Sequence, residues 1–448
     1  MERFVVGIDA DGVLTDMSKF NLEEGRKFFK KEPVNPDAYE SSEMFGISKF
    51  QKNMFGLKVL DKYCRKTPLR EGAKEVITKM SEEGAELHEV TARMFTTIKG
   101  PFGGYYRRLF RNYLKDNELP FKSIQFCSET DSPRDKYMAC LKLGVDVMIE
   151  DKPEVALYLA ERGIKILLFD APYNKGIEGE NLIRVKSWQD CYTEYRKLRE
   201  AKEVIPEYKR LSKDERQGLT KEEQVKYIKS YHAYVKKLNV NEEALKKSEK
   251  RFKLMYYATL LPFSIMFRSK KEGLENIPFQ DGFIIASNHL DWRDQFFISR
   301  ALGNRQFCGF AAESIRNTIR GKMFNFSGGA VFIDRKDDES KRKGEEELAL
   351  KIANDKIGLI FPEGTRKNKN EEGKKIVQLP FKLGTVSLAQ KTGAAILPVS
   401  LYHGHKYSYL KIGELQFVTP EDDLLEANEK LSQKIKTMTL SSMEQDKK

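Results

Sequence analysis

Short runs of apolar residues recur along the chain, and each gives way to polar residues. Such runs begin at Phe4, Leu87 and Val147 in the first half, and at Phe283 and Ile357 in the second. Runs of this length are typical of buried strands in parallel sheets. We therefore expect an α/β protein with functional residues just after the carboxyl ends of its strands, where open α/β sheets place their sites.

Between the two sets of strands, residues 193–251 carry a helical pattern. Thr220 and Glu223 form a capping-box pair, and apolar residues follow at helical spacing, namely Val225, Ile228, Tyr231, Val235 and Leu238. From residue 196 to 253 there are 18 Lys or Arg against 10 Asp or Glu. We expect a basic helical linker, which is either a solvated bridge or a helix attracted to anionic lipid headgroups or an acidic carrier protein.

The most apolar segment is 252–267, and basic residues flank it on both sides. A membrane-spanning helix needs about 20 apolar residues, whereas this run is shorter and contains Pro262. We expect it to lie on a membrane or dip into it. The alternative is a buried core helix of the C-terminal domain.

Length and composition fit two globular domains. The chain has 448 residues, 40% of them hydrophobic, and a net charge of +12. This length exceeds what one hydrophobic core usually organises, so we expect two domains of about 190 residues each. The positive charge would also suit a nucleic acid, but no zinc-ligand spacing and no aromatic RNA-binding motif accompany it. We therefore expect no nucleic acid polymer as a partner.

The five cysteines are dispersed without paired spacing, which favours reduced thiols and a cytoplasmic location. The N-terminus enters a strand pattern within four residues, so we expect no signal region. His403, Gly404 and His405 could suggest a metal site, but no third ligand is near them in sequence, so we expect a structural or surface position. The polar residues 441–448 predict a flexible tail.

The strand beginning at Phe283 leads into His289 and Asp294, which could act as a base and its carboxylate partner. No serine or cysteine lies at a comparable strand end beside them, so the base would activate a substrate hydroxyl rather than a protein nucleophile. This points to direct acyl transfer onto an alcohol. After the strand beginning at Ile357, Gly364 and Arg366 could hold a phosphate.

Here the chain resembles the lysophospholipid acyltransferase family, the 1-acylglycerol-3-phosphate acyltransferases, over 252–440. Four blocks match in order: Asn288, His289 and Asp294; Gly329 to Arg335; Phe361 to Arg366; and Ala395 to Val399. The resemblance implies an α/β glycerolipid acyltransferase fold that needs no cofactor, with His289 as base and Asp294 as its partner. It also implies that Arg335, Glu363, Gly364, Thr365 and Arg366 bind the acceptor.

The first strand ends in the string from Asp9 to Asp16, in which Asp9 and Asp11 are one residue apart. Such a pair could share a hard cation such as Mg²⁺ and offer a nucleophile beside an acid. The next polar strand ends supply Thr91, Glu150 and Asp151.

This arrangement resembles the haloacid dehalogenase superfamily, and the string Asp-x-Asp-Gly-Val-Leu-x-Asp is most similar to its 5′-nucleotidase branch. The resemblance implies a Rossmann-like domain over 1–192 with a helical cap over about 17–70. It implies that Asp9 is the nucleophile, Asp11 the general acid/base, and Thr91 and Lys136 the phosphoryl-binding groups. Asp9, Asp11, Glu150 and Asp151 would hold Mg²⁺, although many relatives have two aspartates where this chain has Glu150 and Asp151.

Together these patterns predict a bifunctional enzyme of phospholipid metabolism attached to the inner face of a membrane. Its donor would be acyl-CoA or an acyl-carrier protein and its acceptor a lysophospholipid. The phosphatase substrate stays open between a lipid phosphate and a soluble nucleotide. The alternative is a soluble 5′-nucleotidase tethered to a membrane by a non-catalytic acyltransferase-like module.

Overall fold

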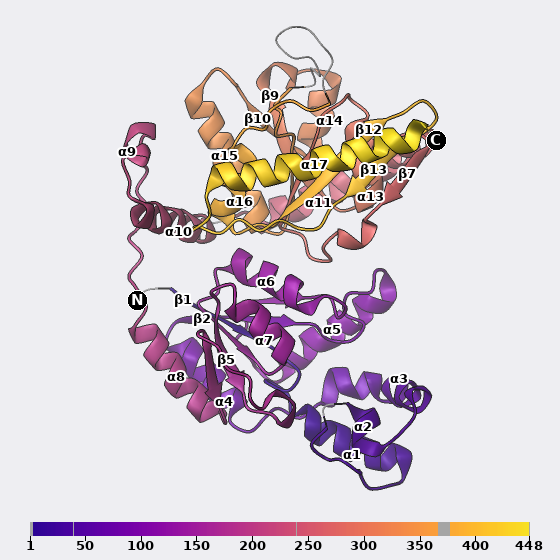
Figure 1. The fold of residues 1–448 in the computed structure, drawn as a ribbon, viewed down its shortest axis with the longest axis vertical. Coiled ribbons are helices and arrows are strands. Elements are labelled where there is room, and N and C mark those ends of the chain that lie inside the picture. Colours follow the sequence, from indigo (N-terminus) through magenta and orange to yellow (C-terminus); the bar gives the residue numbers. More distant parts are fainter. Residues whose placement is uncertain (1–2, 39, 239, 366–376, 448) are drawn as a thin grey trace. The chain divides into compact units, whose positions relative to one another are not determined.

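A computed structural model describes residues 3–38, 40–238, 240–365 and 377–447 (Figure 1). The chain divides into two compact units, Met1–Val204 and Ile205–Lys448, and each is described by itself. Both units are α/β, as the sequence predicted.

The N-terminal unit is built on a six-stranded parallel sheet in the order β3-β2-β1-β4-β5-β6. The strands are β1 (Phe4–Ile8), β2 (Ala85–Thr91), β3 (Ser123–Phe126), β4 (Val147–Glu150), β5 (Lys165–Phe169) and β6 (Leu182–Val185). The order reverses between β1 and β4, and such a switch point opens a crevice at the carboxyl ends of the strands. Asp9 follows β1 directly at this point.

Helices cover this sheet. They are α4 (Ala73–Glu82), α5 (Pro101–Asp116), α6 (Ser132–Leu143), α7 (Pro153–Ala160), the short η1 (Pro172–Asn174) and α8 (Trp188–Glu200). α4 packs beside α8, and α6 packs beside α7. All five residues of β1 are buried, as expected for a strand covered on both faces.

Three helices lie between β1 and β2, in the stretch where we expected a cap: α1 (Met17–Phe29), α2 (Ser41–Phe45) and α3 (Lys49–Lys66). α3 begins at a capping box in which Ser48 and Gln51 bond reciprocally. Phe20 and Phe55 are buried in a cluster between these helices and α5, and Phe45 is buried in a second cluster. Many aromatic residues of this stretch thus form its own core, but Phe50 is 73% exposed.

The C-terminal unit has a seven-stranded sheet in the order β10-β9-β11-β8-β12-β13-β7, in which only β12 and β13 pair antiparallel. The strands are β7 (Ser269–Glu272), β8 (Ile284–Ser287), β9 (Phe307–Ala312), β10 (Ala330–Ile333), β11 (Ile357–Ile360), β12 (Ile396–His403) and β13 (Ser408–Ile412). β8 is central, so His289, two residues beyond it, lies at a carboxyl end in the middle of the sheet.

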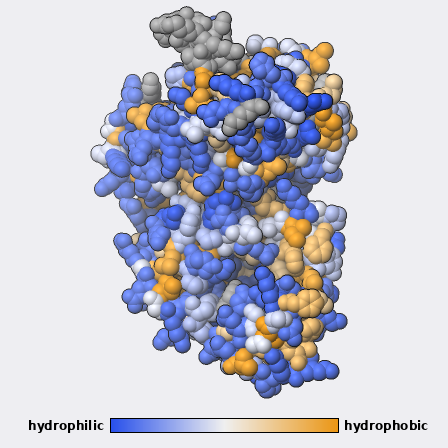
Figure 2. Space-filling model, turned by 45° about the vertical axis from the view of Figure 1, so that its right-hand side comes forward, coloured by the Kyte–Doolittle hydropathy of each residue, from blue (hydrophilic) through white to orange (hydrophobic). Residues whose placement is uncertain are grey.

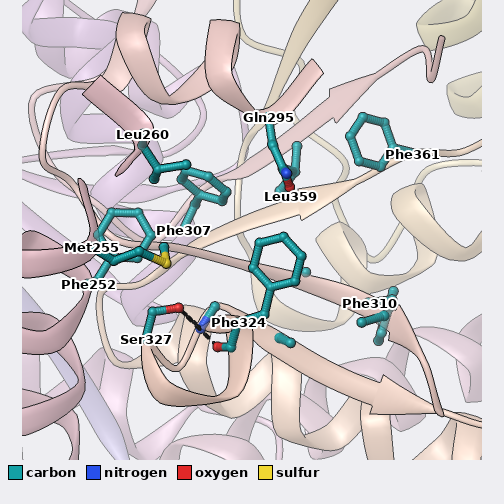
Figure 3. A pocket seen from close by; sticks show the side chains of 14 residues that line it. Phe252, Met255, Leu260, Gln295, Phe307, Phe310, Phe324, Ser327, Leu359 and Phe361 are labelled. Carbon is teal, nitrogen blue, oxygen red and sulfur yellow. Dashed lines mark hydrogen bonds between the residues drawn. The ribbon is translucent and has the colours of Figure 1, made fainter. Parts of the chain in front are cut away.

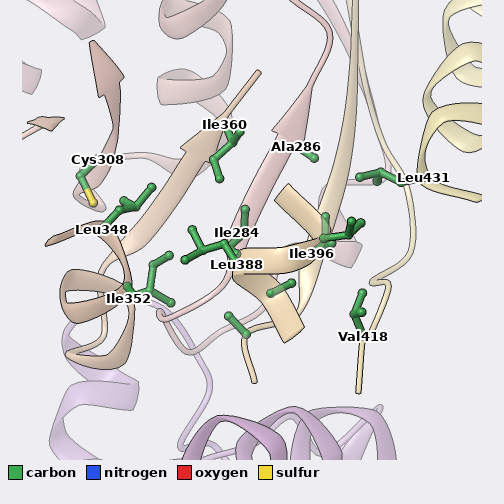
Figure 4. Packing of buried hydrophobic residues seen from close by; sticks show 14 of the residues in the cluster. Ile284, Ala286, Cys308, Leu348, Ile352, Ile360, Leu388, Ile396, Val418 and Leu431 are labelled. Carbon is green, nitrogen blue, oxygen red and sulfur yellow. The ribbon is translucent and has the colours of Figure 1, made fainter. Parts of the chain in front are cut away.

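Two apolar clusters fill this unit. One joins sheet residues such as Ile284 and Ile396 to Leu348, Ile352 and Leu388 of the covering helices (Figure 4). These helices are α13 (Asp294–Leu302), α14 (Ile319–Phe326), α15 (Asp338–Ala353), α16 (Gly384–Thr392) and α17 (Leu424–Lys447), with short turns η3 (Leu274–Asn276) and η4 (Glu313–Ile315).

The expected linker differs from the structure. It contains α9 (Lys213–Gln217), α10 (Lys221–Lys237) and most of α11 (Glu242–Met255), and α10 begins at the expected capping box. Tyr231 and Val235 of α10 are buried in the core of the C-terminal unit, where α10 packs on α15 and α16. α10 is therefore part of that unit rather than a bridge between domains.

The expected flexible tail is also different. α17 continues to Lys447, Ser442 is buried, and Lys411 donates a hydrogen bond to Ser441 across 2.9 Å. Its buried residues Leu431, Ile435, Thr439 and Ser442 recur at helical spacing, so the last turns pack with small polar side chains.

The apolar segment 252–267 forms the end of α11, the π-helical turn η2 (Tyr256–Leu260) and α12 (Leu261–Met266). Phe252, Met255 and Leu260 are buried in the second apolar cluster. Leu254, Tyr257, Ile265 and Met266 are 57–72% exposed. The segment therefore combines a core face with an apolar surface. Among the described residues, no helix has both the length and the hydropathy to cross a bilayer.

Candidate active sites

His289 and Asp294 form a close pair at the carboxyl end of β8. His289 Nδ1 lies 2.6 Å from Asp294 Oδ2, and the backbone N–H groups of Leu290 and Asp291 donate to the same oxygen. Burial alone would raise the pKa of Asp294, but the hydrogen bonds from His289 and His403 hold this pKa below its ordinary value. Asp294 is thus a carboxylate that fixes the ring of His289. The neighbouring Asn288 exchanges two 2.8 Å hydrogen bonds with the backbone of Leu401 and so ties the loop to β12.

His403 is the residue that sequence reasoning missed at this site. Its Nε2 donates to the second oxygen of Asp294, Oδ1, at 3.0 Å, and its Nδ1 lies 2.9 Å from Ser408 Oγ. Its ring packs 5.2 Å from the ring of Phe297. A structural or surface position was expected for His403, and nothing in the sequence indicated that its side chain bonds Asp294. The available signal was its position at the end of β12, the strand that contains most of the fourth sequence block.

The second and third sequence blocks meet beside this pair. Arg335 Nη1 donates to the backbone oxygen of Gly364 at 2.6 Å, and Thr365 follows at a partly exposed position. The Nζ of Lys382 lies 3.0 Å from where a Cβ on Gly364 would stand. Two cations therefore border the Gly364 backbone, and Lys382 is one that the sequence blocks did not indicate. Arg366 lies outside the described residues.

Glu363 occupies a different kind of position from the one expected. Its side chain is 5% exposed, and it accepts hydrogen bonds from the backbone N–H groups of Leu379 and His289. Burial raises the pKa of Glu363 to about 7. Glu363 thus holds the loops around His289, and its role in binding the acceptor stays a prediction.

An apolar pocket that is partly open to solvent adjoins the pair (Figure 3). The ring of His289 stacks on Phe361, with centroids 3.9 Å apart, and Phe361 lines the pocket. The other large lining residues are Phe252, Met255, Leu260, Phe307, Phe310, Phe324 and Leu359. A long apolar group bound here would have one end beside His289.

In the N-terminal unit, Lys136 joins two strand ends. Its Nζ donates to Asp9 Oδ1 and Glu150 Oε2, both at 2.7 Å, and all three side chains are buried. The Oγ1 of Thr91 is buried without a hydrogen-bond partner in the described residues. Such an unused donor fits the phosphoryl-binding role that the sequence suggested. Asp9, Thr91 and Lys136 thus come from β1, β2 and α6 to one edge of the sheet.

Asp9, Glu150 and Asp151 form a cluster that fits a divalent cation. Ligand oxygens from the three lie within 4.8 Å of one another. Burial, and then the charge of Glu150, raise the pKa of Asp9 to about 7. Among the described residues, Lys136 is the one cationic side chain that pairs with these carboxylates, so the cluster keeps an excess of negative charge. Mg²⁺ prefers carboxylate oxygens as ligands.

Asp11 lies at a different place in the site. Tyr63 of α3 donates to its Oδ2, and Arg93 lies 3.2 Å from its Oδ1. The guanidinium of Arg93 is held between the rings of Tyr63 and Phe110, 4.1 and 4.5 Å from their centroids. The Asp11 carboxylate is therefore fixed on both oxygens. Tyr63 and Arg93 had no signal in the motifs, because neither belongs to the matched positions.

Comparisons with known proteins agree with this division. Residues 3–199 match the family described as 5′ nucleotidase, deoxy (pyrimidine), cytosolic type C protein, and residues 268–402 match the family described as acyltransferase.

A nucleotidase of Clostridium acetobutylicum is 31% identical over 208 residues, which cover 46% of this chain and 100% of that protein. A 1-acyl-sn-glycerol-3-phosphate acyltransferase of Borreliella burgdorferi is 33% identical over 139 residues, 30% of this chain and 51% of that protein. The crystal structure of the 1-acyl-sn-glycerophosphate acyltransferase PlsC from Thermotoga maritima is 20% identical, with a TM-score of 0.34 and coverage of 50% and 98% of the two chains. The chain therefore belongs, through residues 3–199, to the cytosolic type C 5′-nucleotidase family of haloacid dehalogenase-like hydrolases, and it carries an acyltransferase domain in its second half.

Proposed function

We propose that the C-terminal domain transfers a fatty acyl group from acyl-CoA or acyl-carrier protein to the free hydroxyl of 1-acylglycerol-3-phosphate. The observation that carries this proposal is the His289–Asp294 pair, with His289 stacked on a residue of an apolar pocket. The pocket suits an acyl chain, and the pair suits deprotonation of the acceptor hydroxyl as it attacks the thioester at the end of that chain. A non-catalytic lipid-binding module would not need such a base.

The chemistry uses few groups. With Nδ1 held by Asp294, Nε2 of His289 is the nitrogen that accepts the proton of the acceptor hydroxyl as its oxygen attacks the thioester carbonyl. The new ester bond forms, the carbon–sulfur bond breaks, and the departing thiolate takes the proton from His289. Arg335 and Lys382, beside Gly364, bind the acceptor phosphate by charge-assisted hydrogen bonds.

The test is incubation of the full chain with lysophosphatidate and radiolabelled acyl-CoA, or acyl-carrier protein as donor, followed by separation of the lipids. His289→Ala should abolish phosphatidate formation, and Arg335→Ala should raise the KM for lysophosphatidate more than it lowers kcat. A His289→Ala protein with wild-type turnover would refute the assignment.

The N-terminal domain is proposed to hydrolyse a phosphate monoester with Mg²⁺. Asp9 is the nucleophile, and Asp11 donates a proton to the leaving group and then activates water. Lys136 and Thr91 hold the phosphoryl oxygens. Asp9 and Asp151, with Glu150 beside them, would hold Mg²⁺, which would neutralise negative charge at the phosphoryl group.

Hydrolysis of p-nitrophenyl phosphate tests this second activity. We expect wild-type hydrolysis to stop with EDTA and return with added Mg²⁺, and Asp9→Asn to be inactive while acyl transfer stays intact. Hydrolysis that persists in Asp9→Asn would contradict the proposed nucleophile.

We also propose that the enzyme works in the cytoplasm as a peripheral membrane protein, through the exposed apolar residues of 252–267. Basic neighbours such as Lys250 and Arg268 suit an anionic headgroup layer. Flotation with anionic vesicles should weaken in Ile265→Ser/Met266→Ser, whereas Leu425→Ser, an equally exposed apolar position on α17, should leave it unchanged.

A further inference from the structure

An exposed apolar row runs along one face of α3 in the N-terminal unit. Phe50, Met54 and Leu57 are 73%, 46% and 59% exposed, and their spacing of four and three residues places them on one side of the helix. The opposite side of α3 is buried through residues such as Phe55 and Val59. Phe20, Phe45 and Phe55 pack in the interior of the cap, whereas Phe50, Met54 and Leu57 are exposed.

A second exposed apolar group adjoins this row. Met94, Ile98, Phe102 and Tyr105 are 40–49% exposed, and they lie in the loop after β2 and at the start of α5. α5 packs against α3, and the hydroxyl of Tyr105 donates to Asp61 of α3 at 3.2 Å. Figure 2 shows hydrophobic side chains gathered on the surface of the N-terminal unit. We call these seven residues the cap face.

The cap face has a strongly basic border. α3 carries one acidic residue, Asp61, and six Lys or Arg, namely Lys49, Lys52, Lys58, Lys62, Arg65 and Lys66. Of the six, Lys52, Lys62 and Arg65 pair with Glu40, Glu24 and Asp61. α5 adds Arg107, Arg108, Arg111 and Lys115, with one acidic residue, Asp116. Large apolar side chains surrounded by lysine suit an anionic bilayer, because the apolar groups enter the acyl region while the cations remain at the headgroups. Protein interfaces, in contrast, are depleted in lysine.

The cap face borders the phosphatase site. Met94 directly follows Arg93, which is paired with Asp11, and Thr91 lies three residues before Met94. α3 also carries Tyr63, which donates to Asp11. Each of the two segments that carry the cap face therefore also carries a residue that contacts the general acid Asp11, namely Tyr63 on α3 and Arg93 before Met94.

We propose that the cap face docks on an anionic lipid bilayer, so that the Asp9 site acts on phosphate monoesters of membrane lipids. This rests on the proposed phosphatase activity of that site. A headgroup phosphate then enters the catalytic crevice while its acyl chains stay in the bilayer beside the cap face. A soluble nucleotide would leave these seven apolar side chains in water without a role.

A fluorescent label on α3 tests the docking itself. The five cysteines are buried, so a Met54→Cys variant of the full chain offers one exposed thiol for an environment-sensitive dye. Vesicles of phosphatidylcholine with phosphatidylglycerol should shift the emission of the dye to shorter wavelength, and high salt should reduce the shift. No shift, or a shift that appears without vesicles as protein concentration rises, would overturn the proposal, and the latter would assign the cap face to a second copy of the chain.

Hydrolysis assays test the substrate class. Phe50→Ser/Met54→Ser/Leu57→Ser should lower kcat/KM for phosphatidate in anionic vesicles by about tenfold or more and leave hydrolysis of p-nitrophenyl phosphate unchanged. Val204→Ser, which changes a 74% exposed apolar residue elsewhere, is the matched control and should behave as wild type. Equal loss with both substrates, or wild-type hydrolysis of phosphatidate by the triple variant, would refute the lipid assignment. A wild-type chain that hydrolyses neither ester would instead refute the proposed phosphatase, while the dye still reports docking.

Discussion

Replacement of His403 gives the sharpest test of how the acyltransferase site is built. Asp294 is fully buried, and its two oxygens are bonded by different histidines, His289 on Oδ2 and His403 on Oδ1. His403→Ala removes the side-chain donor to Oδ1 and leaves the bond to His289 in place. The carboxylate then loses a charge-assisted hydrogen bond and is free to rotate away from His289.

The size of the effect follows from that bond. A hydrogen bond to a charged group contributes about 1.5–3 kcal/mol, and its loss should raise the pKa of Asp294, which the bond from His403 helps to hold low. If the same energy supports the imidazolium of His289 in the transition state, kcat should fall about 10- to 100-fold. The KM for lysophosphatidate should change little, because the contacts of His403 are with Asp294, Ser408 and Phe297.

The assay is steady-state acyl transfer from radiolabelled acyl-CoA, measured from about pH 5 to about pH 9. His403→Ala should lower kcat throughout this range. His403→Gln should recover most of the loss, because its side-chain amide can donate to Oδ1 from a similar position. Wild-type kcat in His403→Ala, or equal impairment of His403→Gln with normal thermal stability, would refute the reasoning.

Three further predictions concern single residues. Because burial raises the pKa of Glu363 from 4.5 to about 7, the folded protein holds a proton that the unfolded chain gives up, and stability falls as pH rises between these values. Glu363→Gln should remove up to about 3 kcal/mol of that fall in urea unfolding compared at about pH 5 and about pH 8, and an unchanged pH dependence would contradict this. Tyr63→Phe should lower kcat for p-nitrophenyl phosphate about tenfold or more without changing acyl transfer, and full activity would show that Asp11 needs no donor from α3. Gly12→Ala should abolish phosphatase activity in the same assay, because φ of Gly12 is +86° and a Cβ would lie 1.9 Å from Asp151 Oδ2, whereas an active variant would refute that packing.

The sequence predicted most of the fold because the signals for it are local. Apolar runs correspond to β1, β2, β4, β8 and β11, and the polar residues that follow them meet at sheet edges. The prediction of a flexible tail at 441–448 was wrong because the residues that pack there are polar. The last turns of α17 bury Thr439 and Ser442, whose hydroxyls bond to carbonyls one turn earlier in the helix, so no apolar stripe marks them.

The sites were predictable only in part, because some of the residues that contact each other are far apart in the sequence. Asp9, Asp11, His289 and Asp294 stand in short strings whose chemistry is readable. The bond between His403 and Asp294 joins residues 109 positions apart, and the bond between Tyr63 and Asp11 joins residues 52 apart. Only the fold brings these pairs together, so a single sequence without an alignment gives no reason to choose them.

Both sites share one structural feature, and residues of the motifs and residues far from them in sequence contribute to it differently. Each contains a carboxylate whose two oxygens are bonded by side chains from distant parts of the chain: Asp294 by His289 and His403, and Asp11 by Tyr63 and Arg93. A carboxylate held in this way needs little reorganisation when charge develops beside it, which is where preorganised sites gain most of their rate. The short motifs therefore determine which reaction each site performs, while distant residues determine how well the carboxylate of each site is oriented. Substitution of the distant residues that bond these carboxylates, namely His403, Tyr63 and Arg93, should accordingly change kcat more than KM in both domains.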